Sequence, residues 1–433
     1  MRTESRLLCV NPPGPPGTVA NREGAGGMGV VVEGDDGFFY PPHALAWATA
    51  AARAEGLSVA LLDAVAERLD EAAALERVAA AAPDVVAVQC SPATGESDAA
   101  FLAALRRELP AARRLAVGAA IEWVAVDLTA VADLVLVGEP EGALAPAARV
   151  VLEARGKVGR KRPQAIGANG YSPSGHFFNY DSLPIPAWDL LPRERYSMYT
   201  AYAGRGCRYY CGYCPYVVAQ GRTHRPRQPS LVAAEVETLI KQFGARRIVF
   251  RDPLFASDPA ATLTLCREMS RRCARHSFHW ECETRPEQLT PDLLRAMRDA
   301  GCTTIKLGVE TVAAGALVAT GRVADVEAAG RYVEQTGRVI ATCRALGIAC
   351  RVFVMAGLPG EDDEGVGTAA WLRTETPDAI HVKPLVHYPG TQFRPTPVTQ
   401  ATFVRLVAVP GRHRSGAPRR LSRLRRALHR LSS

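Results

Sequence analysis

Long hydrophobic runs are absent from this chain of 433 residues. No stretch reaches the roughly 18 consecutive uncharged apolar residues that a membrane-spanning helix needs, so we expect no membrane partner. The apolar start of the chain turns polar at Asn11, too early for a secretory signal peptide, and fits a buried first strand better. We therefore expect a cytoplasmic protein.

Acidic residues are missing from the end of the chain, where positive charge collects. The formal net charge is +8, yet residues 412–430 alone carry eight arginines and no acid. The rest of the chain is close to neutral, which argues against a nucleic-acid-binding surface on the folded domains. We interpret residues 396–433 as a basic, poorly ordered tail and expect no nucleic-acid partner.

A disulfide framework is not expected either, because disulfides are rare in the cytoplasm. Most of the eleven cysteines stand singly in apolar surroundings, as Cys266 and Cys343 do, and are interpreted as small buried core residues. Three are different. Cys207, Cys211 and Cys214 follow one another at C-x₃-C-x₂-C spacing in a glycine-rich loop.

This spacing suits an iron–sulfur cluster. Three thiolates can hold three corners of an iron–sulfur cube, and the missing fourth protein ligand leaves one iron open to a substrate or cofactor. A structural zinc site is the alternative, but zinc normally takes four closed ligands, and only His224 is near enough in sequence to complete them. We therefore predict a [4Fe–4S] cluster on the three cysteines.

Strands and helices alternate along residues 1–150, which we expect to form one α/β domain. A long loop rich in glycine and proline follows the first strand. The expected strands are 7–10, 58–62, 85–88, 115–117 and 134–137, and the expected helices are 43–55, 70–82 and 98–108. Five such units predict a flavodoxin-like or Rossmann-like domain with its ligand at the carboxyl ends of the strands.

A second α/β series begins after residues 151–195, a segment rich in basic residues and proline that we interpret as a linker. Residues 196–395 predict six further strands separated by helices, at 198–203, 247–251, 279–283, 304–307, 350–354 and 380–384. Six such units are typical of a partial (β/α)₆ TIM-type barrel, whose chemistry lies at the C-terminal rim. The cysteine loop directly follows the first of these strands.

The cysteine loop resembles the signature of the radical S-adenosylmethionine (SAM) superfamily. That signature is C-x₃-C-x-aromatic-C after the first barrel strand, and Tyr213 is the aromatic residue here. The resemblance implies that the open iron binds SAM. It also implies that one electron, from an external donor of the flavodoxin or ferredoxin type, cleaves SAM to a 5′-deoxyadenosyl radical. Later segments that match the superfamily are 250–255, 280–285, 307–310, 357–361 and 388–391.

The resemblance also implies roles for individual residues. Asp252 would approach the SAM amino group, Arg285 would reach the SAM carboxylate, and Glu310 would lie near the ribose. Asp252 could instead cap a helix, and Arg285 could be an ordinary surface arginine. Tyr216 is our candidate catalytic residue for proton or hydrogen transfer, and the alternative for it is aromatic packing.

The first domain is similar to the cobalamin-binding domain attached to one branch of this superfamily, with matches at 10–13, 40–42, 62–63 and 137–141. The chain lacks the D-x-H-x-x-G motif, and Gly118-Ala119 stands where two glycines are usual. If cobalamin binds, the resemblance places Ser91, Thr94, Gly118 and Gly138 around the corrin. The alternative is a vestigial domain that binds none.

Three functions remain open at this point. With cobalamin, the resemblance implies a methyltransferase acting on an unactivated carbon, or on phosphorus, of a small-molecule or natural-product substrate in biosynthesis. Without cobalamin, it implies a dehydratase or epimerase acting on a sugar or cyclitol, such as an aminoglycoside precursor. A non-catalytic cobalamin or redox sensor is the third, and it is disfavoured because a sensor needs no SAM-binding rim.

Overall fold

The computed structural model describes residues 6–33, 39–154, 179–361, 364–394 and 400–411. The basic run 155–163 and the arginines of 412–430, which underlie the linker and tail predictions, lie outside the described residues. The chain divides into two compact units, one of Met1–Thr200 with Pro215–Gly221 and one of Ala201–Cys214 with Arg222–Ser433. Within the described ranges, no helix is long and apolar enough to cross a membrane.

The first unit is built on a five-stranded parallel sheet of order β4-β1-β5-β6-β7. Its strands are β1 (Arg6–Asn11), β4 (Ser58–Asp63), β5 (Val85–Gln89), β6 (Arg113–Gly118) and β7 (Leu134–Val137). This is the 2-1-3-4-5 order of flavodoxin-like folds, so of the two predicted topologies the flavodoxin-like one is found. Connections leave β1 and β5 towards opposite sides, which makes their carboxyl ends the expected ligand-binding edge.

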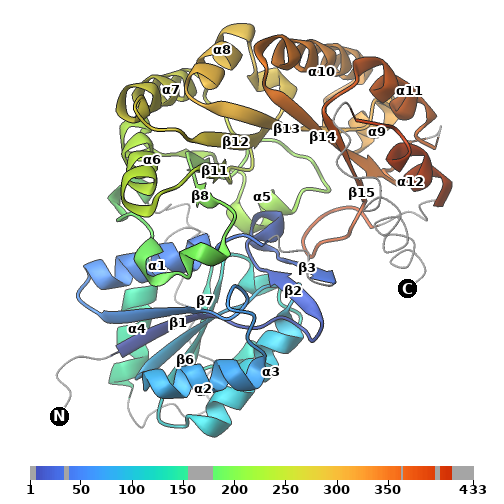
Figure 1. Ribbon diagram of the computed structural model, residues 1–433. Helices are drawn as coiled ribbons and strands as arrows, with labels where there is room; N and C mark the ends of the chain where they lie inside the picture. Colours follow the sequence, from blue (N-terminus) through green and yellow to red (C-terminus); the bar gives the residue numbers. More distant parts are fainter. Residues whose placement is uncertain (1–5, 34–38, 155–178, 362–363, 395–399, 412–433) are drawn as a thin grey trace. The chain divides into compact units, whose positions relative to one another are not determined.

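Four helices cover both faces of this sheet (Figure 1), so its strands are continuous apolar runs. One face is covered by α2 (Glu71–Ala81) and α3 (Gly95–Glu108), and the other by α1 (His43–Ala54) and α4 (Leu144–Glu153). The Asp70 side chain starts α2 by accepting a hydrogen bond from the Ala73 N–H at 2.8 Å.

Two stretches of the first unit are more regular than the sequence predicts. The expected loop after β1 contains an antiparallel hairpin of β2 (Thr18–Asn21) and β3 (Val30–Glu33), with the short 3₁₀ segment η1 (Gly24–Gly27) between them. Part of the expected linker also packs on α1, because the Trp47 Nε1–H donates to the Pro184 carbonyl at 2.7 Å. The first unit consequently extends to Thr200.

The second unit carries the sequential sheet β8-β11-β12-β13-β14-β15, in which the strands from β11 to β15 pair in parallel. Its strands are β8 (Tyr199–Ala201), of which only Ala201 is grouped with the second unit, β11 (Arg247–Phe250), β12 (His279–Thr284), β13 (Cys302–Glu310), β14 (Ala349–Ala356) and β15 (Ala379–Pro384). The helices between them, drawn from yellow-green to red in Figure 1, are α6 (Pro229–Phe243), α7 (Pro259–Cys273), α8 (Pro291–Asp299), α9 (Ala314–Ala319), α10 (Val326–Leu346) and α11 (Val366–Glu375). The predicted α/β class and partial barrel are confirmed.

Helix boundaries in the second unit follow local chemistry. Asp258, Thr290 and Asp325 each accept a hydrogen bond from the backbone N–H three residues further on, and so begin α7, α8 and α10. Gly244 and Gly347 adopt left-handed conformations that end α6 and α10. These signals are local to the ends of each helix.

One prediction about the end of the chain is wrong. Residues 400–407 fall in the segment expected to be poorly ordered, yet they form α12 (Gln400–Val407). The helix buries Phe403 and Leu406, with α11 and β15 as its neighbours. Apolar side chains at this spacing give the helix one buried face, and this effect was masked by the arginine-rich composition beyond it.

Candidate cluster and cofactor site

The cysteine loop leaves the end of β8 and is held by backbone hydrogen bonds. The Gly212 N–H donates to the Thr320 carbonyl at 3.0 Å, and the Gln392 N–H donates to the Gly212 carbonyl at 2.8 Å. A Cβ at position 212 would lie 2.5 Å from side-chain atoms of Gln392 and Phe393. Glycine is therefore needed at this point for the loop to pack as it does.

The three thiols are differently placed. Cys207 and Cys211 are buried and Cys214 is half-buried, and the last two pack in one apolar cluster with Leu358. Burial raises the pKa of the Cys207 thiol, so a metal bound there has to displace its proton. Across the described ranges, no three His, Cys, Asp or Glu side chains are gathered closely enough to hold a metal ion. In an iron–sulfur cube each thiolate ligates a different iron atom, so the spacing required for one ion does not apply to a cluster.

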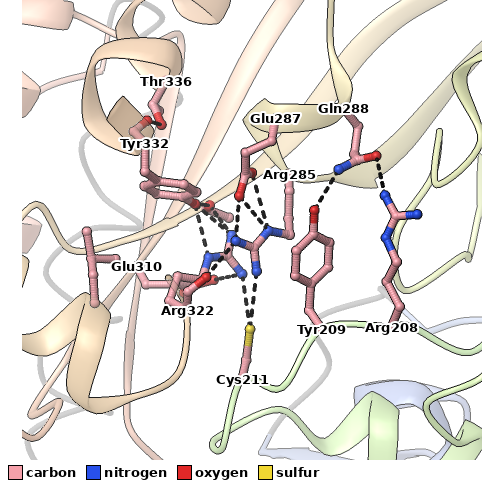
Figure 2. A network of polar contacts seen from close by, with 12 residues as sticks. Arg208, Tyr209, Cys211, Arg285, Glu287, Gln288, Glu310, Arg322, Tyr332 and Thr336 are labelled. Atoms are coloured by element: carbon pink, nitrogen blue, oxygen red, sulfur yellow. Dashed lines mark hydrogen bonds and ion pairs between the residues drawn. The ribbon is translucent and has the colours of Figure 1, made fainter. Parts of the chain in front are cut away.

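Arg285 brings positive charge to this loop (Figure 2). It follows β12, and its Nη1 lies 3.4 Å from the Cys211 Sγ. Its guanidinium stacks 3.8 Å from the ring centroid of Tyr209, and Nη2 donates to Glu287 Oε1 at 2.5 Å and to the Arg322 carbonyl at 2.7 Å. Arg285 is buried, so the alternative of a surface arginine is wrong.

Arg322 is a second arginine on the same sulfur, and sequence reasoning missed it. Its Nη1 lies 3.9 Å from the Cys211 Sγ and 3.3 Å from the Tyr213 hydroxyl, while Nη2 donates to the Gly308 carbonyl at 2.5 Å. It stands after the short helix α9, in Thr320-Gly-Arg322, where no motif marks it. Its burial and its contacts arise from the tertiary structure, so the sequence around position 322 gives no sign of them.

Glu310 completes the network at the end of β13. Its Oε1 lies 3.6 Å from Arg322 Nη1, and its backbone has a φ of 65°, a left-handed conformation that is costly for a glutamate. Burial raises the pKa of Glu310 and the Arg322 guanidinium opposes this shift. A Cβ at Gly308 would come within 2.9 Å of Arg322 and 2.8 Å of Glu310. The structure thus gathers four predicted residues in one place, Cys211, Tyr213, Arg285 and Glu310.

Asp252 lies outside this network. It is buried at the end of β11, where its Oδ2 accepts a hydrogen bond from the Ala203 N–H at 3.0 Å. Burial raises its pKa to about 7, although backbone hydrogen bonds oppose the shift. His224, the candidate fourth zinc ligand, lines the same small cavity of about 30 Å³ as Asp252. Asp252 therefore supports the backbone at the start of the cysteine loop, and its contact with SAM stays a prediction.

Tyr216 belongs to the first unit, because α5 (Pro215–Gln220) is grouped there although it directly follows Cys214. A Cβ at Gly26 in η1 would lie 2.9 Å from both the Cα and the Cγ of Tyr216. Gln220 Nε2 donates to the Gly26 carbonyl at 3.3 Å. These contacts favour the packing alternative for Tyr216, and its catalytic role stays a prediction.

Ser91 and Thr94 lie in a buried polar network at the carboxyl edge of the first sheet. The Ser91 N–H and the Thr94 hydroxyl both donate to Asp98 Oδ2, at 3.0 and 2.7 Å, and the two hydroxyls are 2.9 Å apart. Asp98 in turn pairs with Arg22 at 2.5 Å. The two predicted corrin neighbours therefore already bind one another, and their contact with cobalamin stays a prediction.

The two predicted corrin glycines have packing reasons of their own. A Cβ at Gly118 would come within 2.2 Å of the Cys90 carbonyl oxygen, a distance that no side chain can adopt. Gly138 has a φ of 92° and pairs with Gly118 through an isolated bridge. Both glycines hold the carboxyl ends of β6 and β7 together whether or not a corrin is near.

A pocket of about 740 Å³ opens on this edge of the first unit. It lies between the loop after β1, the loop after β4 and the start of α3, with Phe39, Leu69 and Phe101 in its wall. Open α/β sheets bind their ligands at this edge, and the size suits a small-molecule ligand or part of a larger one.

Comparison with known proteins finds a family match for the second unit. Residues 202–372 match the model of the radical SAM superfamily. An uncharacterized methyltransferase of Pyrococcus horikoshii is 23% identical over 220 residues, 49% of this chain and 46% of that protein. The hopanoid C-2 methylase of Rhodopseudomonas palustris is 30% identical over 132 residues, 30% of this chain and 25% of that protein. The chain thus spans about half or less of the length of these curated relatives.

Solved structures share the fold along most of the chain. The radical SAM methyltransferase TsrM of Kitasatospora setae, solved with cobalamin and a [4Fe–4S] cluster, matches with a TM-score of 0.68 at 20% identity, over 90% of this chain and 74% of that chain. The cobalamin-dependent SAM radical enzyme OxsB, solved with aqua-cobalamin, matches with a TM-score of 0.66 at 14% identity, over 86% and 52%. Taken with the cysteine loop and the barrel, the family match shows that residues 202–372 are similar to the radical SAM superfamily.

Proposed function

We propose that this radical SAM enzyme is a cobalamin-dependent methyltransferase that acts on an unactivated carbon, or on phosphorus, of a small-molecule substrate. The observation that carries the proposal is the pairing, in one chain, of a 2-1-3-4-5 sheet with a three-cysteine barrel loop. TsrM and OxsB share this fold and hold cobalamin, and the two curated relatives are named a methyltransferase and a methylase.

Cys207, Cys211 and Cys214 would hold the cluster, which when bound supplies the electron that cleaves SAM. The buried guanidinium groups of Arg285 and Arg322 at Cys211 suit the negative charge of thiolate ligands. The electron would come from an external flavodoxin- or ferredoxin-type donor. The donor set and its charges therefore fit an iron–sulfur cluster better than a closed zinc site.

Arg285, Glu310 and Tyr213 would orient SAM at the open position of the cluster. Arg285 directs Nη1 towards the cysteine loop, where a carboxylate of SAM would accept a charge-assisted hydrogen bond. Glu310, held by Arg322, offers an acceptor for a ribose hydroxyl. Asp252 would act from further away, by fixing the Ala203 backbone at the start of the loop.

The carboxyl edge of the first sheet would hold cobalamin, which when bound supplies the methyl group for transfer. The pocket of about 740 Å³ provides ligand-sized space at this edge. Ser91, Thr94, Gly118 and Gly138 would shape the edge through the contacts they make with one another and with Cys90 and Asp98. The chain lacks the D-x-H-x-x-G motif, so binding of cobalamin would rest on these residues and the pocket and not on the histidine of that motif.

A cobalamin-independent dehydratase or epimerase acting on a sugar or cyclitol is the second candidate. The observation that favours it is that each predicted corrin residue has a packing or hydrogen-bonding partner within the first unit. Such a unit would be stable without cobalamin. The reaction would then need only the barrel site and SAM.

Products separate the two candidates. Anaerobically reconstituted protein is incubated with SAM, hydroxocobalamin and titanium(III) citrate, and 5′-deoxyadenosine and S-adenosylhomocysteine are quantified, with Cys211→Ala as the control. A methyltransferase yields both products and retains the cobalamin spectrum through gel filtration. Formation of 5′-deoxyadenosine alone, without retained cobalamin, would replace the methyltransferase with the second candidate.

A further inference from the structure

We propose that Arg322 is a positioning residue whose guanidinium donates to the Cys211 sulfur in the loaded protein and raises the reduction potential of the cluster. The inference rests on the proposed function, since it requires Cys211 to be a cluster ligand. It assigns to Arg322, which no sequence motif marks, an effect on the reduction potential of the cluster.

Three hydrogen bonds to two groups other than Cys211 fix the position of Arg322. Nη2 donates to the Gly308 carbonyl at 2.5 Å and to the Tyr332 hydroxyl at 2.7 Å, and Nε is 3.1 Å from the same hydroxyl. The Tyr332 hydroxyl also donates to the Gly308 carbonyl. Only 7% of the Arg322 surface is exposed, so water screens its charge poorly.

The remaining edge of the guanidinium faces the cysteine loop (Figure 2). Nη1 lies 3.9 Å from the Cys211 Sγ, and the neighbouring guanidinium of Arg285 lies 3.4 Å from the same sulfur. Two buried guanidinium groups next to one sulfur create a strongly positive electrostatic potential at that sulfur. A neutral thiol gains little from that potential, whereas a thiolate that ligates iron accepts charge-assisted hydrogen bonds from both.

The consequence for the cluster follows from charge. The electron from the reductant makes the cluster one unit more negative, and no proton is needed because arginine stays protonated. A fixed positive donor at a ligand sulfur stabilises the reduced form more than the oxidised form. Hydrogen bonds to the sulfurs and net charge are among the factors that set cluster potentials. Arg322 therefore makes the cluster easier to reduce by a weak cellular donor.

The test compares four variants of the full chain after anaerobic reconstitution. Arg322→Gln removes the charge, Arg322→Lys keeps the charge without the planar fork, and Tyr332→Phe removes the hydroxyl that holds Arg322. Arg208→Gln is the matched control, because Arg208 is exposed on the same loop and its guanidinium contacts Gln288 at 3.4 Å. Iron and sulfide content is measured first, then the midpoint potential by EPR-monitored titration without SAM.

Arg322→Gln is expected to lower the equilibrium constant for one-electron reduction at least tenfold, which corresponds to about 59 mV. Arg322→Lys and Tyr332→Phe should show smaller shifts in the same direction, and Arg208→Gln less than a threefold change. If Arg322→Gln does not load a cluster, Tyr332→Phe and Arg322→Lys decide the matter. Wild-type potentials in both would overturn the inference, and so would an equal shift in Arg208→Gln.

Failure of the inference and failure of the proposed function are distinguishable. If the wild-type protein binds no iron and sulfide, the proposed function fails at its first step. If the wild type loads a cluster and the Arg322 variants keep its potential, the proposed function stands and only the inference falls.

Discussion

The backbone of Gly118 lies so close to that of Cys90 that a Cβ on Gly118 would meet the Cys90 carbonyl oxygen at 2.2 Å. Gly118 ends β6 and Cys90 directly follows the neighbouring strand β5, and the Cys90 N–H donates to the Val117 carbonyl at 2.8 Å. We expect Gly118→Ala to lower the free energy of unfolding by about 1–3 kcal/mol, because backbone has to move. Urea denaturation of the cofactor-free protein measures this.

Gly330 provides the matched control for this substitution. It is exposed in the second turn of α10, and a Cβ there would meet nothing within 4 Å. Gly330→Ala should stabilise the protein by roughly 0.5–1 kcal/mol, since glycine is a poor helix former. Equal stability of Gly118→Ala and wild type would contradict the packing argument and would favour a corrin-facing role for Gly118.

The cluster cysteines can be told apart from the core cysteines. Substitution of Cys207, Cys211 or Cys214 by alanine should abolish binding of iron and sulfide and the charge-transfer absorbance, because three thiolates are needed. Cys266→Ala and Cys343→Ala remove equally buried thiols elsewhere in the second unit and should leave both unchanged. Tightly bound zinc without sulfide in the wild-type protein would contradict the iron–sulfur interpretation.

Asp252 predicts a pH dependence of stability. Burial raises its pKa in the folded protein from 3.8 to about 7, so the folded state binds this proton more tightly than the unfolded state does. Its contribution to stability is complete below pH 3.8 and is lost as the pH rises through 7. Asp252→Asn stays neutral and can still accept the Ala203 N–H.

The difference in unfolding free energy between wild type and Asp252→Asn should therefore change by up to about 4 kcal/mol across this range. The wild type becomes less stable relative to Asp252→Asn as the pH rises. Guanidinium chloride denaturation of cofactor-free protein at a series of pH values measures the difference. A difference that is constant over the range would show that Asp252 titrates normally.

The buried pair of Arg22 and Asp98 should be strongly coupled. Both side chains are almost fully buried and lie 2.5 Å apart. Arg22→Met should cost about 3–5 kcal/mol, because it leaves a buried carboxylate without its partner. Adding Asp98→Asn should recover part of the loss in thermal denaturation. Arg107→Met, which breaks an exposed pair with Glu108, should cost no more than about 1 kcal/mol.

The fold was largely predictable because its signals are local. Buried runs such as Val85–Gln89 and caps such as Asp70 and Gly347 mark elements by themselves. The β2–β3 hairpin was not predicted. Each of its strands has only four residues, too few to show an alternation of apolar and polar side chains, and a glycine-rich segment separates them. The helix α12 was missed because composition was weighed over a whole segment, while Phe403 and Leu406 decide its packing.

The site was predictable only where a motif fixes residues along the chain. Cys211, Tyr213, Arg285 and Glu310 come from motifs, and the structure gathers them. Arg322 comes from a loop without a motif, and its place at the Cys211 sulfur depends on three elements folded together. In the first unit, the residue types of Ser91, Thr94 and Gly118 suit contact with a ligand and contact within the protein equally well. The sequence alone therefore could not show that they bind or pack against Asp98 and Cys90.

The grouping of α5 with the first unit has a consequence for the modularity of the protein. The chain passes from the first unit to the second after Thr200, returns at Pro215, and leaves again after Gly221. The two units are therefore interleaved, and no single cut in the backbone separates them. A truncated protein that begins at Ala201 would contain α5 without η1, the segment that α5 packs against.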